Sequence, residues 1–146
     1  MRREEREYRA VVEARNPLPM EVVVEGIVVP GDRRGRLLGF PTANIVPGGD
    51  AELPEDGVFA GRVQRADGSW YGAAVSIGTR PTFHGEDAER LVEAFLLDFD
   101  GDLYGERLRV YVGERVRGQQ RFESIDALIA QMKRDVEVIR RLLDDI

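Results

Sequence analysis

The sequence predicts a mainly β domain, either an antiparallel barrel or a sandwich, that ends in one long α-helix. Short β-branched segments alternate with Gly-rich turns along most of the chain, and this pattern is typical of antiparallel folds. Near the C-terminus, apolar residues recur at three- and four-residue steps, which indicates a helix. A chain of 146 residues fits one domain and is long enough to bury a core without disulfides.

The expected strands begin at Glu21 and are separated by turn residues. β-Branched residues mark them, with clear alternation from Val58 to Val63. Asp67 and Gly68 favour a tight hairpin turn between two of these strands. The segments predicted as strands are residues 21–29, 57–65, 70–78, 90–99 and 106–114.

Residues 1–20 differ in composition from the rest of the chain. They form a charged segment with Tyr8, Val11 and Val12 at helical spacing, followed by two prolines that act as a breaker. We expect a short helix or a disordered arm here and assign it no chemistry. The barrel or sandwich domain, with its helix, is therefore expected at residues 21–146.

The C-terminal segment predicts an amphipathic helix. Ser124 is placed to cap its N-terminus, and Asp126 adds a negative charge in the first turn, where it favours the helix dipole. We expect the apolar stripe to cover a face or an open end of the β structure. Its members are Ile125, Leu128, Ile129, Met132, Val136, Ile139, Leu142 and Leu143.

Composition excludes several classes of site. The chain has no cysteine, so disulfides, cysteine-bound zinc and thiol catalysis are excluded, and the single His84 excludes a site made of several histidines. Any metal must therefore be held by oxygen ligands, which suits Mg²⁺. A net charge of −6 argues against a general polyanion-binding surface, so we expect no nucleic-acid partner, although "GDRRGR" is a local basic loop.

No apolar run approaches the roughly 20 residues that a membrane span requires. The N-terminus also lacks the apolar region of a secretory signal. We therefore expect no membrane contact and a cytoplasmic location.

The stretch "GRLLGFPTANI", residues 35–45, predicts a stiff loop that could bind phosphate. Gly35 and Gly39 permit close backbone approach, Pro41 stiffens the turn, and Arg36 could contact a phosphate. Residues two apart in an extended segment project to the same side, so Thr42 and Asn44 could hold one hard cation. The alternative is that both side chains hydrogen-bond within their own turn.

Glu93 is the candidate catalytic carboxylate. Alternation places it on the strand face that also carries Phe95 and Leu97, a combination that is uncommon for a purely exposed edge. A carboxylate in such surroundings can act as a general base. A solvated, outward-facing glutamate is the alternative.

Two loops could add to a site. "DFDGDLYG", residues 98–105, is either a binding flap with Tyr104 as an aromatic lid or an ordinary hairpin connection. "SIGTRPTFHG", residues 76–85, is another loop stiffened by Gly and Pro. His84 within it is expected on the surface, since the chain offers no second histidine or cysteine as its partner.

Taken together, these segments resemble the riboflavin kinase module of bacterial bifunctional FAD synthetases and of eukaryotic riboflavin kinases. The likeness runs from about residue 22 to residue 143, and its motifs occur in the family's order. They are residues 26–45, 57–61, 71–83 and 92–110, followed by Gln131 and Asp135 in a Gln-x-x-x-Asp pattern.

The resemblance implies a six-stranded Greek-key β-barrel with a C-terminal helix. It also implies transfer of the ATP γ-phosphate to the ribityl 5′-hydroxyl of riboflavin, which gives FMN and ADP. In the "PTAN" motif, Thr42 and Asn44 would bind Mg²⁺ and the ATP phosphates, and Glu93 would be the base. The loop from Gly31 to Gly39 would cover the nucleotide. The implied flaps over the flavin end comprise Asp98, Phe99, Asp102, Leu103, Tyr104, Gly105 and, in "VRGQQRF", Arg117.

The chain departs from the family pattern in three ways. No adenylyltransferase module precedes the barrel, so we do not expect FAD synthesis from FMN. Gln119 stands where the family commonly has glutamate, and Phe95 stands where many bacterial members have histidine. Both lie near the expected flavin side and leave open a preference for a flavin analogue.

Two other function classes compete with the kinase. One is a non-catalytic barrel that binds flavin or nucleotide as a sensor, but such a protein has no need of a base at Glu93. The other is a small RNA-binding barrel using "GDRRGR", against which the acidic composition argues.

Overall fold

A computed structural model of the chain describes residues 22–29, 42–47, 52–81 and 88–144. The predicted arm at residues 1–20 lies outside these residues, so its structure remains a prediction. The elements, in chain order, are β1 (Val22–Val29), β2 (Thr42–Pro47), β3 (Gly57–Gln64), β4 (Trp70–Pro81), β5 (Ala88–Leu96), β6 (Arg107–Arg117) and α2 (Ile125–Asp144).

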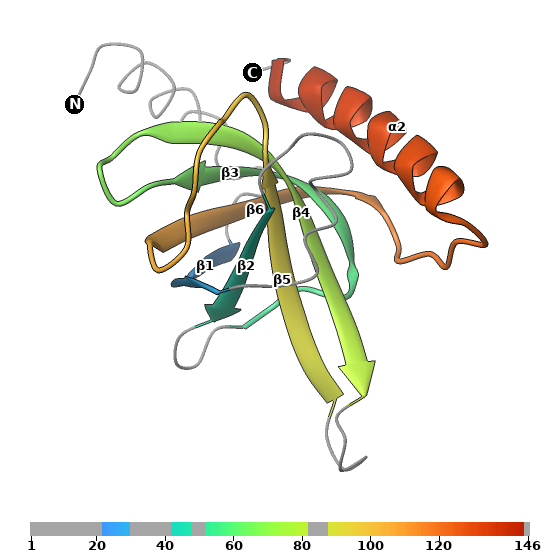
Figure 1. Cartoon of the computed structure of the whole chain (residues 1–146), viewed down its shortest axis with the longest axis horizontal. Coiled ribbons are helices and arrows are strands. Elements are labelled where there is room, and N and C mark those ends of the chain that lie inside the picture. The colour runs from blue at the N-terminus through green and yellow to red at the C-terminus, as the bar shows by residue number, and fades with distance from the viewer. Residues whose placement is uncertain (1–21, 30–41, 48–51, 82–87, 145–146) are drawn as a thin grey trace.

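The strands form a closed antiparallel barrel in the order β1-β2-β5-β4-β3-β6 (Figure 1). Strands β3, β4 and β5 pair in sequence, and β6 returns to lie beside β3. Three consecutive strands with a fourth beside the first make a Greek key. The predicted six-stranded Greek-key barrel with a C-terminal helix is confirmed.

Five of the strands lie where their residue patterns predict them. The hairpin between β3 and β4 turns at Asp67 and Gly68, as predicted: the Arg65 amide donates to the Ser69 carbonyl, and Gly68 has φ of 90°. The remaining strand is β2, which begins at Thr42. It includes residues 42–45, the end of the stretch predicted as a stiff loop, so this part of the stretch is an extended strand.

The barrel interior holds the main apolar core. Strand residues alternate between interior and exterior, so one side chain in two faces this core. Its buried members include Val24, Ala43, Ile45, Phe59, Val75, Ile77, Val92, Ala94, Leu96, Leu108 and Val110.

A second apolar cluster lies on the outside of the barrel, beneath α2. Ala60, Ala74 and Leu97 contribute from the sheet side, and Met132 and Ile139 contribute from the helix. Burial of each large apolar side chain contributes about 1.5–3 kcal/mol, so this cluster fixes the helix to the sheet. The helix thus covers an outer face of the barrel (Figure 1), which is one of the two predicted arrangements.

The helix begins as its sequence predicts. The Ala127 amide donates to the Ser124 Oγ atom at 3.1 Å, and the Leu128 amide donates to the Ser124 carbonyl at 3.1 Å. The first contact satisfies an amide of the first turn that has no partner within the helix, and the second is the first regular hydrogen bond of the helix. In the described part of the chain, no helix is long and apolar enough to cross a membrane.

Candidate active site

Side chains from five strands form one row across the outer face of the barrel. Asn44 on β2 pairs with Glu93 on β5, and Glu93 pairs with Ser76 on β4. Ser76 in turn pairs with Val58 on β3, which pairs with Arg117 on β6. Residues directly opposite in antiparallel strands have Cβ atoms about 5 Å apart, so neighbouring side chains in this row are within reach of each other.

Thr42 lies beside this row. It is two residues before Asn44 on β2, so it projects from the same face, and its partner on β5 is Phe95. Thr42, Asn44 and Glu93 are all half-buried. The structure therefore brings together the residues predicted as metal ligands and the one predicted as base, although their roles remain predictions.

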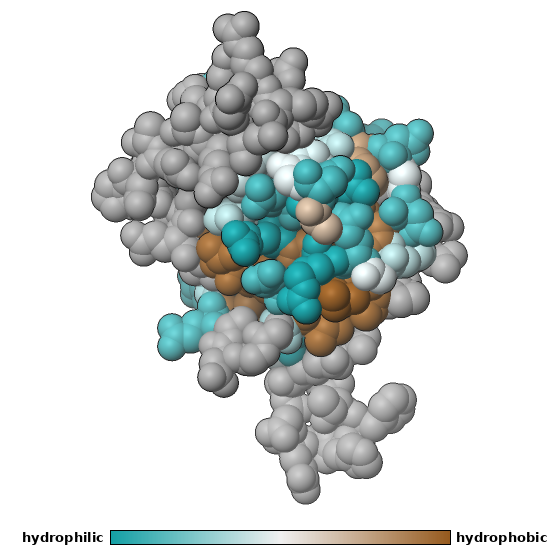
Figure 2. Space-filling model, turned by 90° about the vertical axis from the view of Figure 1, so that its left-hand side faces the viewer, coloured by the Kyte–Doolittle hydropathy of each residue, from teal (hydrophilic) through white to brown (hydrophobic). Residues whose placement is uncertain are grey.

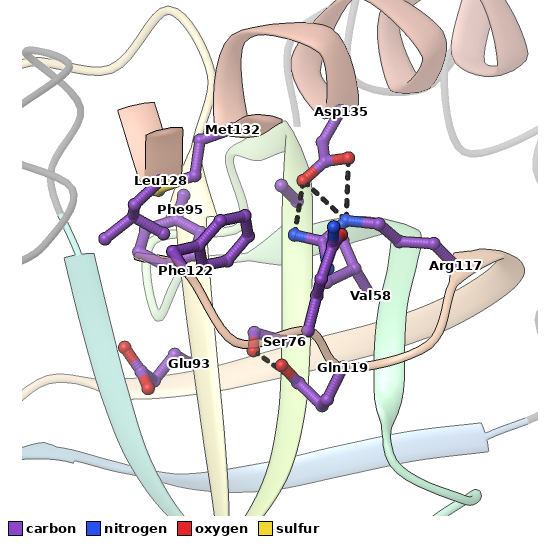
Figure 3. A pocket seen from close by; sticks show the side chains of 12 residues that line it. Val58, Ser76, Glu93, Phe95, Arg117, Gln119, Phe122, Leu128, Met132 and Asp135 are labelled. Atoms are coloured by element: carbon purple, nitrogen blue, oxygen red, sulfur yellow. Dashed lines mark hydrogen bonds and ion pairs between the residues drawn. The ribbon is translucent and has the colours of Figure 1, made fainter. Parts of the chain in front are cut away.

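Glu93 also lines a pocket between the barrel and α2, with a volume of about 70 Å³ (Figure 3). As predicted, it shares its strand face with Phe95 and Leu97, which both belong to the cluster beneath the helix. The pocket combines an apolar wall with a polar side. Its lining is Val58, Ala74, Ser76, Glu93, Phe95, Arg117, Gln119, Gln120, Phe122, Leu128, Met132 and Asp135.

The segment after β6 closes one side of the pocket. Arg117 is paired with Asp135 of α2, and its guanidinium lies 5.8 Å from the centre of the Phe122 ring. The Gln119 Nε2 atom donates to Ser76 Oγ at 3.0 Å, to the Ile77 carbonyl at 2.9 Å and to the Gly57 carbonyl at 3.3 Å. Arg117 thus attaches the end of β6 to the helix, and Gln119 attaches the segment after it to strands β3 and β4.

A second cavity, of about 340 Å³, lies on another side of the barrel. Glu25, Arg65, Arg107 and Arg109 line it near the β3–β4 hairpin and the start of β6. Figure 2 views this side and shows hydrophilic side chains gathered at its centre. Two carboxylates offset part of the positive charge of the three arginines: hydrogen bonds to Glu106 raise the pKa of Arg65 further above its ordinary value, and Glu25 lies 3.9 Å from both other arginines.

Comparison with known proteins decides the family. The model of the flavokinase family, described as riboflavin kinase, matches residues 18–143. The chain belongs to the riboflavin kinase family.

Two relatives and one solved structure illustrate the similarity of the chain to riboflavin kinases. The bifunctional riboflavin kinase/FMN adenylyltransferase of Escherichia coli (strain K12) is 42% identical over 112 residues, which cover 77% of this chain and 35% of that protein. The RNA-binding riboflavin kinase RibR of Bacillus subtilis is 34% identical, over 82% of this chain and 50% of that protein. The crystal structure of riboflavin kinase from Trypanosoma brucei matches with a TM-score of 0.60 and 30% identity, over 84% of this chain and 79% of that chain.

The chain spans only part of its bacterial relatives. It matches 39% of the bifunctional enzyme of Bacillus subtilis, and between 35% and 50% of the other bacterial relatives. The family relation thus concerns the kinase part of the bifunctional proteins.

The residues of one implied riboflavin kinase flap lie outside the lining of this pocket, and their role over the flavin remains a prediction. Asp98, Phe99, Asp102, Leu103, Tyr104 and Gly105 lie in the β5–β6 connection, and none of them lines the pocket around Glu93. Leu103 is buried in the barrel core, and the Gly105 amide donates to the Val28 carbonyl. Hydrogen bonds from Arg140 of α2 hold the pKa of Asp98 below its ordinary value. This connection is thus packed against the barrel and the helix.

Several predicted residues lie outside the described part of the chain. These are Gly31, Gly35, Arg36, Gly39 and Pro41, together with the loop around His84. The proposed roles of residues 31–41 in covering and binding the nucleotide, and the expected surface position of His84, remain predictions.

The residue patterns did not single out the helical side of the pocket. Leu128 and Met132 were predicted as part of an apolar stripe, and Asp135 falls on the same side of the helix by its spacing. A carboxylate inside an apolar helix stripe is the signal that could have marked this position. Ser76 and Phe122 are further lining residues without a local signal.

Proposed function

We propose that the chain phosphorylates riboflavin: it transfers the γ-phosphate of ATP to the ribityl 5′-hydroxyl and releases FMN and ADP. The main support is the position of Glu93, which faces Asn44 across β2 and β5 and also lines the pocket. A carboxylate beside neutral oxygen donors suits a reaction between a hydroxyl and a charged phosphate. We further propose that this reaction takes place in the cytoplasm.

In this proposal Glu93 acts as general base. Its carboxylate accepts the proton of the 5′-hydroxyl while the hydroxyl oxygen forms a bond to the γ-phosphorus. The bond from phosphorus to the bridging oxygen breaks at the same centre, and its electron pair leaves with ADP. Proton transfer of this kind contributes typically about 10²–10⁴-fold to the rate. The remaining acceleration comes from placing the two reactants in line.

Thr42 and Asn44 fit a magnesium ion that arrives with ATP. Both are half-buried, and their oxygens are the hard, neutral ligands that Mg²⁺ accepts. In the described part of the chain, no group of three or more His, Cys, Asp or Glu residues could hold a metal ion. The phosphates would therefore supply the anionic ligands. Bound Mg²⁺ would neutralise charge on the phosphates.

The apolar wall suits the ring system of riboflavin. Phe95, Phe122 and Met132 offer flat and adaptable surfaces, and Arg117 offers polar donors beside them. A volume of about 70 Å³ is well below the roughly 300–1,000 Å³ of typical ligand sites. We therefore expect the segment after Gly118 to move away from α2 when the ring binds, as flaps over active sites commonly do.

The competing function is a flavin or nucleotide sensor with the same pocket and no chemistry. Incubation of the chain with riboflavin, ATP and Mg²⁺, with separation of products by chromatography, distinguishes the two. We expect FMN and ADP in equal amounts. Riboflavin binding without product would favour the sensor, and no binding of riboflavin would contradict both functions.

A further inference from the structure

Arg117 crosses from the barrel to the helix and ends on Asp135. Its Nε atom donates to Asp135 Oδ1 at 2.9 Å and Oδ2 at 3.0 Å, and its Nη2 atom donates to Oδ2 at 2.8 Å (Figure 3). Two parallel contacts of this kind fix the plane of the guanidinium as well as its position. The backbone of Arg117 is fixed too, because it ends β6 and pairs with Val58.

The pairing leaves donors of Arg117 available to a ligand. The Nη1 atom gives one N–H to the Gly118 carbonyl at 3.0 Å, and the Nη2 atom gives one to Asp135. Each terminal nitrogen of a guanidinium carries two hydrogens, so each keeps one further donor. Since Arg117 lines the pocket, these donors can meet an acceptor such as a ring carbonyl of a flavin.

Asp135 is itself held firmly in place. Gln131, one helical turn earlier, donates to Asp135 Oδ1 at 2.9 Å, and Arg134 donates to the Gln131 Oε1 atom at 2.9 Å. The side chain of Asp135 is only 6% exposed. A buried carboxylate on a rigid helix, with its oxygens satisfied by named donors, can orient a long arginine side chain.

We propose that Asp135 is a positioning residue for flavin binding, which acts by holding the Arg117 guanidinium over the pocket. The inference rests on the proposed riboflavin kinase function. Gln131 completes the arrangement by orienting Asp135. Without the carboxylate, Arg117 would sample other rotamers, and its free donors would no longer face the ring in one geometry.

The alternative is that the pair only attaches α2 to the barrel. The same helix offers a matched comparison, because Arg140 also pairs with a barrel residue, Asp98, through two contacts of 3.0 Å. That pair is far more exposed, at 41% for Arg140 and 75% for Asp98, and Arg140 does not line the pocket. Loss of the Arg140 pair therefore changes the attachment of the helix and leaves the pocket lining intact.

The test compares Asp135→Asn with Arg140→Gln in the full chain. Riboflavin affinity is measured by quenching of flavin fluorescence, the KM for ATP by steady-state kinetics, and folding by thermal denaturation. We expect Asp135→Asn to weaken riboflavin binding about tenfold to a hundredfold, as loss of a charged hydrogen-bond partner does, with the KM for ATP within about twofold. Arg140→Gln should bind riboflavin like the unmodified chain.

A second comparison, made in the Arg117→Gln protein, tests whether Asp135 affects riboflavin binding through Arg117 or independently of it. If Asp135 acts through Arg117, then adding Asp135→Asn to Arg117→Gln should lower riboflavin affinity no further. Additive losses, or unchanged riboflavin affinity in a folded Asp135→Asn protein, would overturn the positioning role alone. If the unmodified chain bound no riboflavin, both this inference and the proposed function would be overturned.

Discussion

The carboxylate of Glu93 and the amide of Asn44 lie opposite each other on β5 and β2, with Thr42 two residues away on the same face. The three residues differ in what they can contribute. Glu93 can accept a proton, whereas Thr42 and Asn44 can only offer neutral oxygens. In the proposed function, proton transfer therefore belongs to β5, and placement of the phosphates belongs to the neighbouring strand β2.

Thr42 provides a prediction for nucleotide binding. We expect Thr42→Ala to weaken Mg²⁺-dependent ATP binding by about tenfold or more, because the hydroxyl oxygen contacts charged groups in our proposal. Calorimetric titration with ATP, with and without Mg²⁺, measures the effect. Val46→Ala is a matched control, since Val46 projects from the same face of β2 and is 55% exposed. Equal ATP affinities for Thr42→Ala and the unmodified chain would exclude Thr42 from the site.

The hydrogen bonds of Gln119 give a structural reason for one departure from the family pattern. It donates through Nε2 to two backbone carbonyls and to Ser76, which a glutamate could not do. We expect Gln119→Glu to lower the free energy of unfolding by about 1–2 kcal/mol, because a carboxylate would face the Ile77 and Gly57 carbonyls. Urea denaturation measures the change, and Gln120→Glu is the control at the next residue. If both variants unfold alike, Gln119 does not hold the segment in place.

The helix α2 serves the fold and the site at once. Its apolar stripe packs on the barrel, and Leu128, Met132 and Asp135 line the pocket from the same element. A change in how the helix packs at these three residues would therefore alter the pocket. Strand β2 has a comparable double role, since it closes the barrel between β1 and β5 and carries Thr42 and Asn44.

Ile139 tests the packing of the helix. It is fully buried in the cluster between α2 and the barrel. We expect Ile139→Ala to lower the free energy of unfolding by about 2–5 kcal/mol, because the lost burial is combined with a cavity. Chemical denaturation measures this value. Val138→Ala, at a position that is 38% exposed, should change it by less than about 0.5 kcal/mol. Similar small changes in both variants would show that the helix is not anchored at Ile139.

At the scale of the whole molecule, local patterns predicted most of the elements. Alternation and β-branched residues located β1, β3, β4, β5 and β6, and the helical period located α2. Strand β2 was not predicted from its residues, because it is short and follows a stretch rich in Gly and Pro. The order of strands was not readable from residue patterns either, since a local pattern does not specify which strands pair. The closed Greek-key order was expected only through the family resemblance.

The candidate site was also predictable only in part: its residues could be selected from the sequence, but their proximity could not. Residue types and alternation selected Thr42, Asn44 and Glu93, but their proximity depends on the pairing of β2 with β5. Asp135 came to the pocket only because α2 folds back over the barrel. The segment at residues 98–105 was expected to form a flap only through the family resemblance, and buried Leu103 packs it against the barrel. Long-range packing, which no local pattern encodes, decided each of these outcomes.

The most direct test of the proposed function is the rate of FMN formation by Glu93→Gln, measured together with its riboflavin affinity. Glutamine keeps the size and polarity of the side chain and removes its capacity to accept a proton. We expect a rate about 10²–10⁴-fold below that of the unmodified chain, with riboflavin affinity retained. A rate near that of the unmodified chain would contradict the role of Glu93 as general base.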